Sequence, residues 1–521
     1  MSNPLSLHFV GGADEIGGSC LVLEAAGERL LFDFGSRLEE GAAPGFPNFQ
    51  KEPVPGQTLF LTHGHLDHTG GLPLYRELFP ESRICGSPVT GSLIAARGDS
   101  RGIVTLHEWS PVAAGGFRIT PFPVPHSVPG AFGYLIEHSG RRIVLSGDFN
   151  TEKCSERSRR LWKRVRETAG EGIDLFLCDG TGLLRREPGP TEAEVGEELR
   201  RIFRTESGDI YATCFSSNWS RIASLYEAAQ LTDRKVYCSG TSMESSLRIA
   251  SSSGYGILAG ASIPGFSGQQ GAKLVIASGS QGESVGAFFK MSGEDSPVTA
   301  EDAVIYSAFP VPGNGPFVKQ LLDRFSRLTE RMYTPPLDPV HAGGHPSRME
   351  VAFVLDILQP GRWFPIHTAP HYAATAARGD LPGEVPSRLQ RGTVLRVDNG
   401  VSLIQPGQPS SRFITAPSQM ERERLHDAGF MHFTLLRNGR IIGAGSVVTR
   451  GFIRRRDASE FLNELIIQLE GCAEEAVSEG ILGSSALGSR LEEEMARYIF
   501  RLTGKNPEVI VSLIECPGLR E

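Results

Sequence analysis

Three histidines and one aspartate lie within six consecutive residues, in the order His63-Gly-His65-Leu-Asp67-His68. The apolar segment 59–62 before them predicts a short buried strand. Because His63 and His65 are two positions apart, their rings point the same way on an extended segment. Asp67 and His68 follow where the chain turns, so they can face a second point nearby. Imidazole and carboxylate are ligand types that suit zinc and similar divalent ions.

A lone His-x-His pair arises often by chance and then indicates two surface histidines. The full pattern is far more specific, because it follows a strand and precedes Gly70-Gly71. Two ions held about 3.5–4 Å apart would suit in-line displacement at phosphorus. The segment therefore predicts a dinuclear metal centre whose remaining ligands come from elsewhere in the chain.

Further candidate ligands occur in or after apolar, strand-like segments. They include His126, Asp148 and His367, and strands also end at the carboxylates Asp33 and Asp179. Taken alone, an aspartate at a strand end is a common turn former, and a histidine in a proline-rich loop is unremarkable. As a set, in this order around the histidine segment, they favour one shared site.

Length and composition describe a globular chain of more than one domain. At 521 residues the chain is too long for one core, and two to four domains are expected. No apolar run of about 18 residues occurs, so no membrane span is predicted, and the start lacks the features of a secretion signal. The eight cysteines are scattered without a C-x-x-C pair, which favours free thiols and a cytoplasmic location.

The net charge of −8 argues against a nonspecific polyanion binder, although a local basic groove with metal ions can still contact nucleic acid. The basic run 153–166 indicates a solvated helix face, with a phosphate-contacting patch as the alternative. Ser216-Ser217-Asn218 caps a predicted helix at 219–230, which gives either an anion site or an ordinary cap.

Helix signals and strand signals outline the domains. Capping boxes predict helix starts at Thr191 and Ser347. Strands and helices alternate from about 206 to 335, which predicts an inserted α/β domain with a parallel sheet. The last hundred or so residues predict a hairpin, two helices and a strand without any motif that carries chemistry, so we interpret them as a packing or assembly module.

The segment His63-Gly-His65-Leu-Asp67-His68 resembles the signature of the metallo-β-lactamase fold, a four-layer αββα sandwich with metals at one edge. The insertion and the later histidine motifs resemble the β-CASP branch of that fold, which processes nucleic acids. Almost the whole chain is similar to the ribonuclease J family. The segments that carry this likeness include Gly11–Gly17, Phe215–Arg221, Gly279–Glu283, Pro310–Asn314, Val448–Phe452 and Thr503–Pro507.

The resemblance implies an α/β fold made of a metallo-β-lactamase sandwich, an inserted β-CASP domain and a small C-terminal α+β domain. The implied boundaries are 1–205 and 336–405 for the two parts of the sandwich, 206–335 for the insertion, 406–420 for a linker and 421–521 for the C-terminal domain.

The resemblance also implies site residues. The implied metal ligands are His63, His65 and His126 for one ion, Asp67, His68 and His367 for the second, and Asp148 as a bridge. Asp33 would support the ligands through hydrogen bonds. The implied ions are two divalent metals, zinc first and manganese as the alternative.

Catalytic roles are implied for Asp67, Asp179 and His345, with His345 giving a proton to the departing 3′ oxygen. The residues implied to bind substrate phosphate are Ser216, Ser217, Asn218, Arg221, His341 and Ser347. Two departures from the family pattern, Gly343 in place of a serine and Thr368-Ala369-Pro370 after the last ligand, affect end recognition and the balance of exonuclease and endonuclease activity.

The implied activity is metal-dependent hydrolysis of RNA, 5′ to 3′ from monophosphorylated ends and also internally, by a homodimer or homotetramer that acts on single strands. Two other classes explain part of the sequence. A lactonase or thioesterase of the same fold explains the metal motifs but not the insertion. A non-catalytic RNA-binding relative, or one that acts on DNA, explains the insertion; the complete ligand set argues against a non-catalytic protein.

Overall fold

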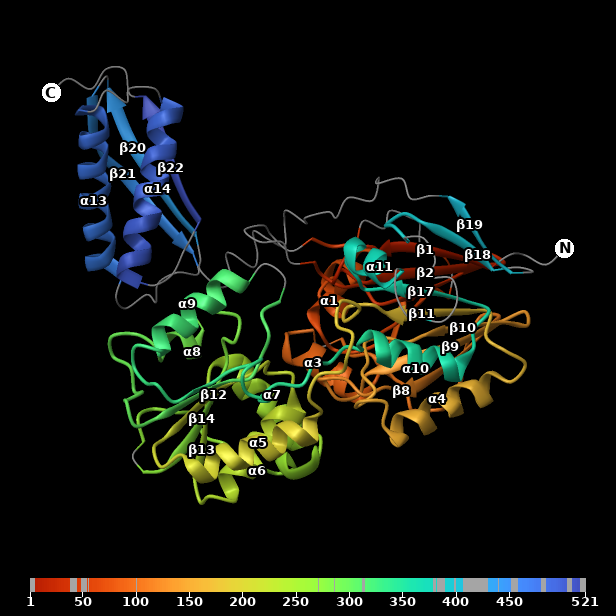
Figure 1. Ribbon diagram of the computed structural model, residues 1–521. Coiled ribbons are helices and arrows are strands. Elements are labelled where there is room, and N and C mark those ends of the chain that lie inside the picture. Colours follow the sequence, from red (N-terminus) through yellow and green to blue (C-terminus); the bar gives the residue numbers. More distant parts are fainter. Residues whose placement is uncertain are drawn as a thin grey trace. The chain divides into compact units, whose positions relative to one another are not determined.

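Two facing β-sheets form the centre of the first of two units, residues 1–414 and 415–521, in the computed structural model (Figure 1). Each unit is described by itself. The structure describes residues 5–37, 45–47, 54, 56–99, 101–269, 271–284, 286–311, 314–377, 381, 389–397, 400–405, 430–438, 440–450, 458–478, 484–503 and 508–515. The predicted linker 406–420 lies outside them.

The first sheet carries the strand that precedes the histidine segment. In spatial order its strands are β19 (Val401–Gln405), β18 (Val394–Val397), β1 (Leu5–Gly11), β2 (Cys20–Ala25), β3 (Glu28–Phe32), β4 (Thr58–Phe60), β5 (Arg83–Gly86) and β6 (Val104–Thr105). The β3, β4 and β5 strands run parallel, so their carboxyl ends share one edge.

The second sheet carries the strands that end near the other candidate ligands. Its spatial order is β17 (Arg362–Ile366), β11 (Leu175–Asp179), β10 (Arg141–Leu145), β9 (Phe132–His138), β8 (Phe117–Pro123) and β7 (Val112–Ala114). Parallel pairing of β10 with β11 and of β11 with β17 aligns the carboxyl ends of these three strands.

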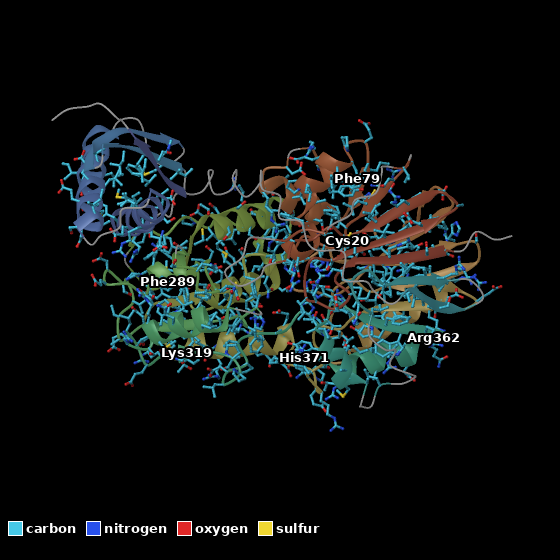
Figure 2. The ribbon with its side chains drawn as sticks, turned by 90° about the horizontal axis from the view of Figure 1, so that it is seen from above. Cys20, Phe79, Phe289, Lys319, Arg362 and His371 are labelled. Atoms are coloured by element: carbon cyan, nitrogen blue, oxygen red, sulfur yellow. The ribbon has the colours of Figure 1, made fainter. Side chains whose placement is uncertain are left out.

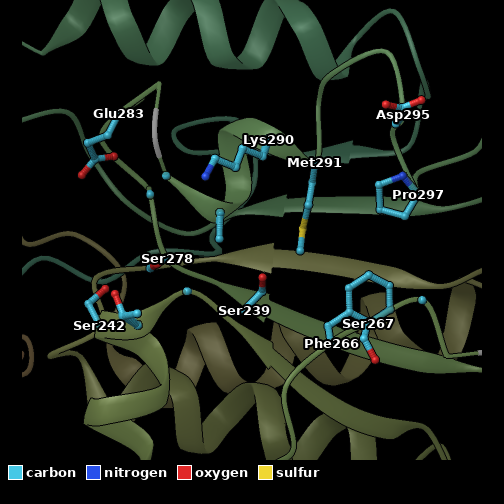
Figure 3. A pocket seen from close by; sticks show the side chains of 16 residues that line it. Ser239, Ser242, Phe266, Ser267, Ser278, Glu283, Lys290, Met291, Asp295 and Pro297 are labelled. Atoms are coloured by element: carbon cyan, nitrogen blue, oxygen red, sulfur yellow. The ribbon is translucent and has the colours of Figure 1, made fainter. Parts of the chain in front are cut away.

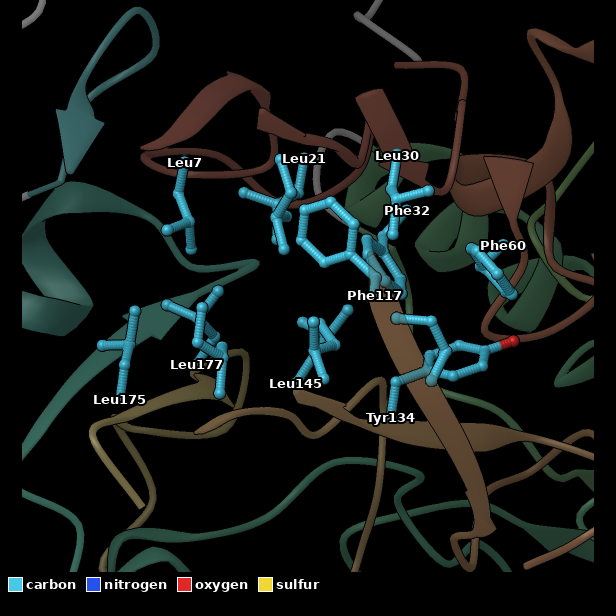
Figure 4. Packing of buried hydrophobic residues seen from close by; sticks show 14 of the residues in the cluster. Leu7, Leu21, Leu30, Phe32, Phe60, Phe117, Tyr134, Leu145, Leu175 and Leu177 are labelled. Atoms are coloured by element: carbon cyan, nitrogen blue, oxygen red, sulfur yellow. The ribbon is translucent and has the colours of Figure 1, made fainter. Parts of the chain in front are cut away.

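Alternating side chains explain why the two sheets lie between helices. Leu175 and Leu177 point into the core between the sheets (Figure 4), whereas Phe176 packs in a different cluster with Trp162. Successive side chains of a strand lie on opposite faces of the sheet. A strand with apolar side chains on both faces must therefore be covered by other elements on both faces.

Helices cover the outer faces of both sheets. The helices of this domain are α1 (Leu66–Thr69), α2 (Leu72–Leu78), α3 (Pro88–Ala96), α4 (Glu156–Ala169), α10 (Arg348–Leu358) and α11 (Pro370–Ala376). Trp162 of α4 and Val354 of α10 pack on the second sheet, and Tyr75 of α2 packs on the first. The predicted αββα sandwich is confirmed.

The insertion forms a third sheet whose strands are all parallel. Its spatial order is β13 (Lys235–Ser239), β14 (Lys273–Ala277), β12 (Ile210–Thr213), β15 (Ala303–Tyr306) and β16 (Met332–Tyr333). The helices of the insertion are α6 (Trp219–Gln230), α7 (Thr241–Ser252), η1 (Gly256–Leu258), α8 (Ala287–Lys290) and α9 (Gly315–Phe325). The helix α5 (Glu192–Thr205) precedes the predicted boundary at 206, yet its buried face packs in the same cluster as this sheet. Leu93 and Val128 of the sandwich share a buried cluster with Trp219 and Met243, which joins the two parts of the unit.

The second unit has a three-stranded sheet and two helices. They are β20 (Phe430–Asn438), which pairs antiparallel with β21 (Arg440–Arg450) and parallel with β22 (Glu508–Glu515), and α13 (Ala458–Ser478) and α14 (Ser484–Thr503). Leu469 and Leu491 of the helices pack against Phe433. None of the described helices is long and apolar enough to cross a membrane.

Glu350 ties α10 to the loop that carries Asp148. One carboxylate oxygen accepts hydrogen bonds from N–H and Oγ1 of Thr151, and the other accepts from N–H and Oγ of Ser347. The side chain is only 3% exposed. Its removal would leave several buried donors without an acceptor.

We therefore expect Glu350→Ala to lower the free energy of unfolding by about 3 kcal/mol, measured by urea denaturation. Asp356→Ala, at an exposed position of the same helix, is the matched control and should change it by less than about 0.5 kcal/mol. Equal effects of the two substitutions would contradict the assigned role of Glu350.

Candidate metal centre

The predicted ligands come together at the carboxyl edges of the two central sheets. His63 follows β4, Asp148 follows β10 and His367 follows β17. His126 comes shortly after β8, and Asp67 lies on the short helix α1 rather than in a simple turn. Distant parts of the sequence therefore meet because strands that lie next to each other in the sheets end at the same edge.

The first group contains His63, His65 and His126, whose ligand atoms lie within 4.8 Å of one another. Nδ1 of His65 lies 3.0 Å from Nε2 of His63 and 3.3 Å from Nε2 of His126. Burial and neighbouring imidazoles lower the pKa of His63 well below its usual value and that of His65 to about 3. Burial lowers the pKa of His126 to about 4. All three rings are therefore neutral, which is the form that binds metal.

In His63 and His126, the ring nitrogen that faces away from the group makes a hydrogen bond. The lone pair of the other ring nitrogen therefore points into the group. Nδ1–H of His126 donates to the carbonyl of Gly344 at 2.9 Å, so Nε2 carries the lone pair. The hydroxyl of Thr62 donates to Asp33, so it accepts from Nδ1–H of His63 at 3.1 Å. Two unprotonated nitrogens thus face Nδ1 of His65, and either a proton on that Nδ1 or a bound cation satisfies them.

The second group contains Asp67, His68, Asp148 and His367, again within 4.8 Å. Nε2 of His68 lies 3.3 Å from Oδ2 of Asp148, and Nε2 of His367 lies 3.2 Å from Oδ2 of Asp67. Oδ2 of Asp148 also lies 3.8 Å from Nε2 of His63, which belongs to the first group. Although burial opposes the charge, the carboxylates of Asp148 and Asp67 raise the pKa of His68 well above its usual value. The two carboxylates thus favour positive charge in this group, and divalent cations could supply that charge in place of the protons.

Asp33 orients the ligands without reaching the centre itself. Its Oδ2 accepts from Nδ1–H of His68 at 2.8 Å and from Oγ1 of Thr62 at 2.7 Å, and its Oδ1 accepts from the Thr62 N–H at 2.7 Å. Both Asp33 and His367 have left-handed backbone conformations, with φ of 58° and 51°. Such strain persists where the surrounding structure fixes a functional residue.

The sequence reasoning did not identify Thr62 and Thr181 as part of the centre. The Thr181 hydroxyl donates to the His367 carbonyl and accepts from its Nδ1–H at 2.8 Å, which turns Nε2 toward Asp67. Gly344 is also required, because a Cβ there would lie 2.8 Å from the His126 ring. The position of Thr181 two residues after the strand-end Asp179 was the one available signal.

A histidine–carboxylate pair lies beside the second group. Nδ1 of His345 lies 2.7 Å from Oδ2 of Asp179 and 3.9 Å from Oδ2 of Asp148. Although burial opposes the charge, Asp179 and then Asp148 raise the pKa of His345 to about 9. The His345 side chain is 28% exposed, so a protonated imidazole faces the site from one side.

The residues predicted to bind phosphate fall into two sets. Ser217 lies at the centre, with Oγ 3.0 Å from Nε2 of His65. Ser216 and Asn218 flank it at the start of α6, where the Asn218 side chain accepts from the N–H of Arg221 at 3.0 Å.

The second set is held by other protein groups. Arg221 is fully buried and donates to Glu192, Ser307 and the Val340 carbonyl. Ser347 is buried as the cap of α10. Nδ1–H of His341 donates to the Ser307 carbonyl at 3.0 Å. These contacts position the loops around the site, and direct phosphate binding by these three residues stays a prediction.

A cavity of about 400 Å³ opens beside the centre, and its lining includes His126, Arg185, Gly343 and His345. A second cavity of about 770 Å³ lies in the insertion, where Ser239 ends β13 and Ser278 follows β14 (Figure 3). None of the described residues that line the second cavity belongs to the predicted site.

Three family models match successive parts of the chain. The beta-lactamase superfamily domain matches residues 29–212, the ribonuclease J beta-CASP domain matches 207–325, and the ribonuclease J C-terminal domain matches 420–516.

Curated relatives match over most of their length. Ribonuclease J of Mycolicibacterium smegmatis is 25% identical over 550 residues, which cover 98% of this chain and 97% of that protein. Ribonuclease J of Thermus thermophilus is 27% identical, with 97% and 94% covered. A solved structure of a protein of unknown function from Enterococcus faecalis has a TM-score of 0.57 at 15% identity, covers 76% of this chain and 100% of its own, and supports the fold alone.

The sandwich and the histidine and aspartate groups at its edge define a hydrolase of the metallo-β-lactamase fold with a β-CASP insertion. With the domain matches in this order, the chain belongs to the ribonuclease J family.

We predict that Asp33→Asn weakens metal binding about 10- to 100-fold. An amide in place of the carboxylate can turn an N–H toward Nδ1 of His68, which would then carry its proton on Nε2 and lose that lone pair as a ligand. Competition of the purified protein with a chromogenic chelator measures the affinity. Asp174→Asn, just before β11 and at the opposite edge of the sheet, is the control. Unchanged affinity in Asp33→Asn would rule out this role.

Proposed function

We propose that this chain is a metal-dependent ribonuclease that hydrolyses phosphodiester bonds, both 5′ to 3′ from monophosphorylated ends and internally. The observation that carries the proposal is the meeting of the two ligand groups with the His345–Asp179 pair beside one cavity. A small-molecule hydrolase of this fold would account for the two ligand groups but not for the inserted domain or the His345 motif.

The ligand groups support two divalent ions, zinc in preference to manganese. Imidazole nitrogens make up the first group and mixed imidazole and carboxylate the second, which suit zinc. When bound, two such ions would lower the pKa of a coordinated water and neutralise charge on the phosphate oxygens. We assign the first ion to His63, His65 and His126, as predicted. The second ion is assigned to Asp67, His68 and His367, with Asp148 between the two.

His345 is the proton donor in this proposal. The water gives up one proton to bulk solvent as its oxygen bonds to phosphorus. The bond from phosphorus to the 3′ oxygen breaks, and that oxygen leaves with the proton from His345. The products are a 5′ phosphate and a 3′ hydroxyl. Asp179 holds Nδ1 of His345 at 2.7 Å and favours the protonated ring, so a proton is present at neutral pH.

Substrate phosphate would be bound by Ser217 with the neighbouring Ser216 and Asn218. Ser217 lies at the start of α6, where backbone N–H groups favour an anion. Asp67 has a side chain 35% exposed and belongs to the face of the centre that substrate can reach.

The remaining assignments follow from the sequence. The proposed substrate is single-stranded RNA, and the proposed assembly is a homodimer or homotetramer. The cysteines that the structure describes are all free thiols, which suits a reducing cytoplasm. The proposed division of the first unit into 1–205, 206–335 and 336–405 follows its sheets, because the third sheet takes all its strands from the middle segment.

We expect the metal-loaded protein to shorten RNA that carries a 5′ monophosphate and to release products with 5′ phosphates. Removal of the metal by a chelator, or the double change His65→Ala with Asp67→Ala, should abolish the activity because each group loses a ligand. Denaturing gels of 3′-labelled RNA provide the measurement. Hydrolysis of lactones without hydrolysis of RNA, or RNA binding without turnover at full metal content, would overturn the proposal.

His345→Ala should lower kcat about 10²- to 10⁴-fold while the metal content stays unchanged. His371→Ala removes an exposed histidine on α11 (Figure 2) and should retain wild-type kcat. Metal loss from His345→Ala would show that His345 is a ligand and not the acid.

A further inference from the structure

The helix α4 and the turn before it are strongly basic, although the net charge of the chain is −8. Between positions 153 and 166 the only acidic residue is Glu156. Basic residues three or four positions apart are neighbours on a helix and repel one another, so such a segment is unfavourable unless anions compensate its charge. The basic residues are Lys153, Arg157, Arg159, Arg160, Lys163, Arg164 and Arg166.

On one side of α4 the arginines serve the packing of the sandwich. Arg166 donates to the Leu358 carbonyl, and the Arg159 guanidinium lies 4.8 Å from the centre of the Phe353 ring. Phe353 and Leu358 belong to α10, which lies next to α4 (Figure 1). The fold therefore accounts for these two cations.

On another side of α4, Arg157, Arg160 and Arg164 form a basic face that packing does not explain. They lie three and four positions apart, so they share one face of the helix, and all three are exposed. Carboxylate oxygens approach Arg157 and Arg160 only at 3.9 and 3.8 Å, and exposed pairs of this kind contribute little to stability. Arg164 has no carboxylate within ion-pair distance among the residues that the structure describes. The charge of the basic face is thus available to an anion from outside the chain.

An aromatic ring next to the basic face favours nucleic acid as that anion. The Arg164 guanidinium lies 4.0 Å from a ring centre of the half-buried Trp109, which itself stacks on Phe122. A guanidinium held on a ring keeps its N–H groups free for phosphate oxygens, and nucleotide bases stack on planar groups of both kinds. Positive charge alone would suit an acidic protein or an anionic membrane equally well, whereas the stacked ring suits RNA.

The basic face begins at the cavity beside the candidate metal centre. Arg157 and Leu161 of α4 line this cavity together with His345. From Arg157 to Arg164 the helix rises about 10 Å, at about 1.5 Å per residue, so the face extends beyond the cavity along the surface of the sandwich. A chain that leaves the cavity along α4 would therefore pass over Arg160 and Arg164.

The proposed reaction determines which part of the RNA takes this route. His345 gives its proton to the departing 3′ oxygen, so the part of the RNA that ends in this oxygen lies on the His345 side of the centre. When the first nucleotide is removed from an end, that part is a single nucleotide. When the cut is internal, that part is a longer chain, which must continue past the cavity.

We propose that the basic face of α4 binds the backbone of the RNA that precedes an internal cleavage site. This inference rests on the proposed ribonuclease function and adds a binding surface outside the ligand groups. The face serves internal cleavage and is not needed when single nucleotides are removed from an end.

The test compares a circular RNA, which has no end and can only be cut internally, with a linear RNA of the same sequence that carries a labelled 5′ monophosphate. Arg160→Gln with Arg164→Gln should raise KM for the circle about 10-fold, with kcat and metal content little changed. Release of the first nucleotide from the linear RNA should stay within about twofold of wild type. Arg157 remains unchanged in this variant, so the cavity keeps its lining.

Lys319→Gln with Arg327→Gln is the matched control, because it removes two exposed cations from the inserted domain, and it should cleave both RNAs as wild type does. Binding without turnover is measured with the metal-loaded His345→Ala protein and the circular RNA. There the loss of Arg160 and Arg164 should reduce the slope of log affinity against log salt by about 1.4, at about 0.7 for each phosphate contact on a single strand.

Equal losses on the circular and the linear RNA, or no loss on either, would overturn this inference. Unchanged RNA binding together with lost binding to vesicles that contain phosphatidylserine would assign the face to a membrane surface and would overturn it as well. A wild-type protein that leaves both RNAs intact would overturn the proposed function, and the salt dependence of binding would still show whether the basic face contacts RNA.

Discussion

The close approach of unprotonated imidazole nitrogens is the interaction on which the rest of the site depends. Nδ1 of His65 lies 3.0 Å from Nε2 of His63 and 3.3 Å from Nε2 of His126. Hydrogen bonds to Thr62 and to the Gly344 carbonyl keep the ring protons of His63 and His126 on their Nδ1 atoms, away from the centre. Lone pairs this close repel one another unless a proton or a cation lies between them. Burial disfavours a charged imidazolium here, so the contact is satisfied either by the single proton of neutral His65 on Nδ1 or by a metal ion. Three imidazoles in one group, next to carboxylates, are the ligand set that favours the metal ion.

The two central sheets hold the ring nitrogens of these histidines close together. Parallel strands in each sheet end at the same edge, so residues as distant as Asp67 and His367 lie 3.2 Å apart. The insertion adds Ser217 next to the ligand His65. The buried Arg221 ties its helix to the Val340 carbonyl, just before the loop that ends at His345. Thus one unit brings together the proposed metal ligands, the proposed acid His345 and the walls of the cavity beside them.

Local signals in the sequence predicted the helices and strands well. The helix expected at 219–230 forms at Trp219–Gln230 because Asn218 caps it, and the capping boxes at Thr191 and Ser347 are both present. The strand before His63 is short and buried, as its apolar pattern predicts. These features depend on neighbouring residues, which one sequence contains.

Long-range contacts were much harder to predict. The sequence places Arg221 at a helix start that suits anions, whereas in the structure its guanidinium is buried against Glu192. Arg185 has no pattern around it, and its contact with the His345 loop depends on Gly343, whose lack of a side chain leaves room for the guanidinium. Such a pairing needs the fold before it can be recognised.

Anomalous diffraction from crystals of the zinc-loaded protein, recorded on both sides of the zinc absorption edge, tests the central claim most directly. The account predicts two peaks about 3.5–4 Å apart, one among His63, His65 and His126 and one among Asp67, His68 and His367, with the Asp148 carboxylate between them. A single peak, or ions bound away from these side chains, would contradict it.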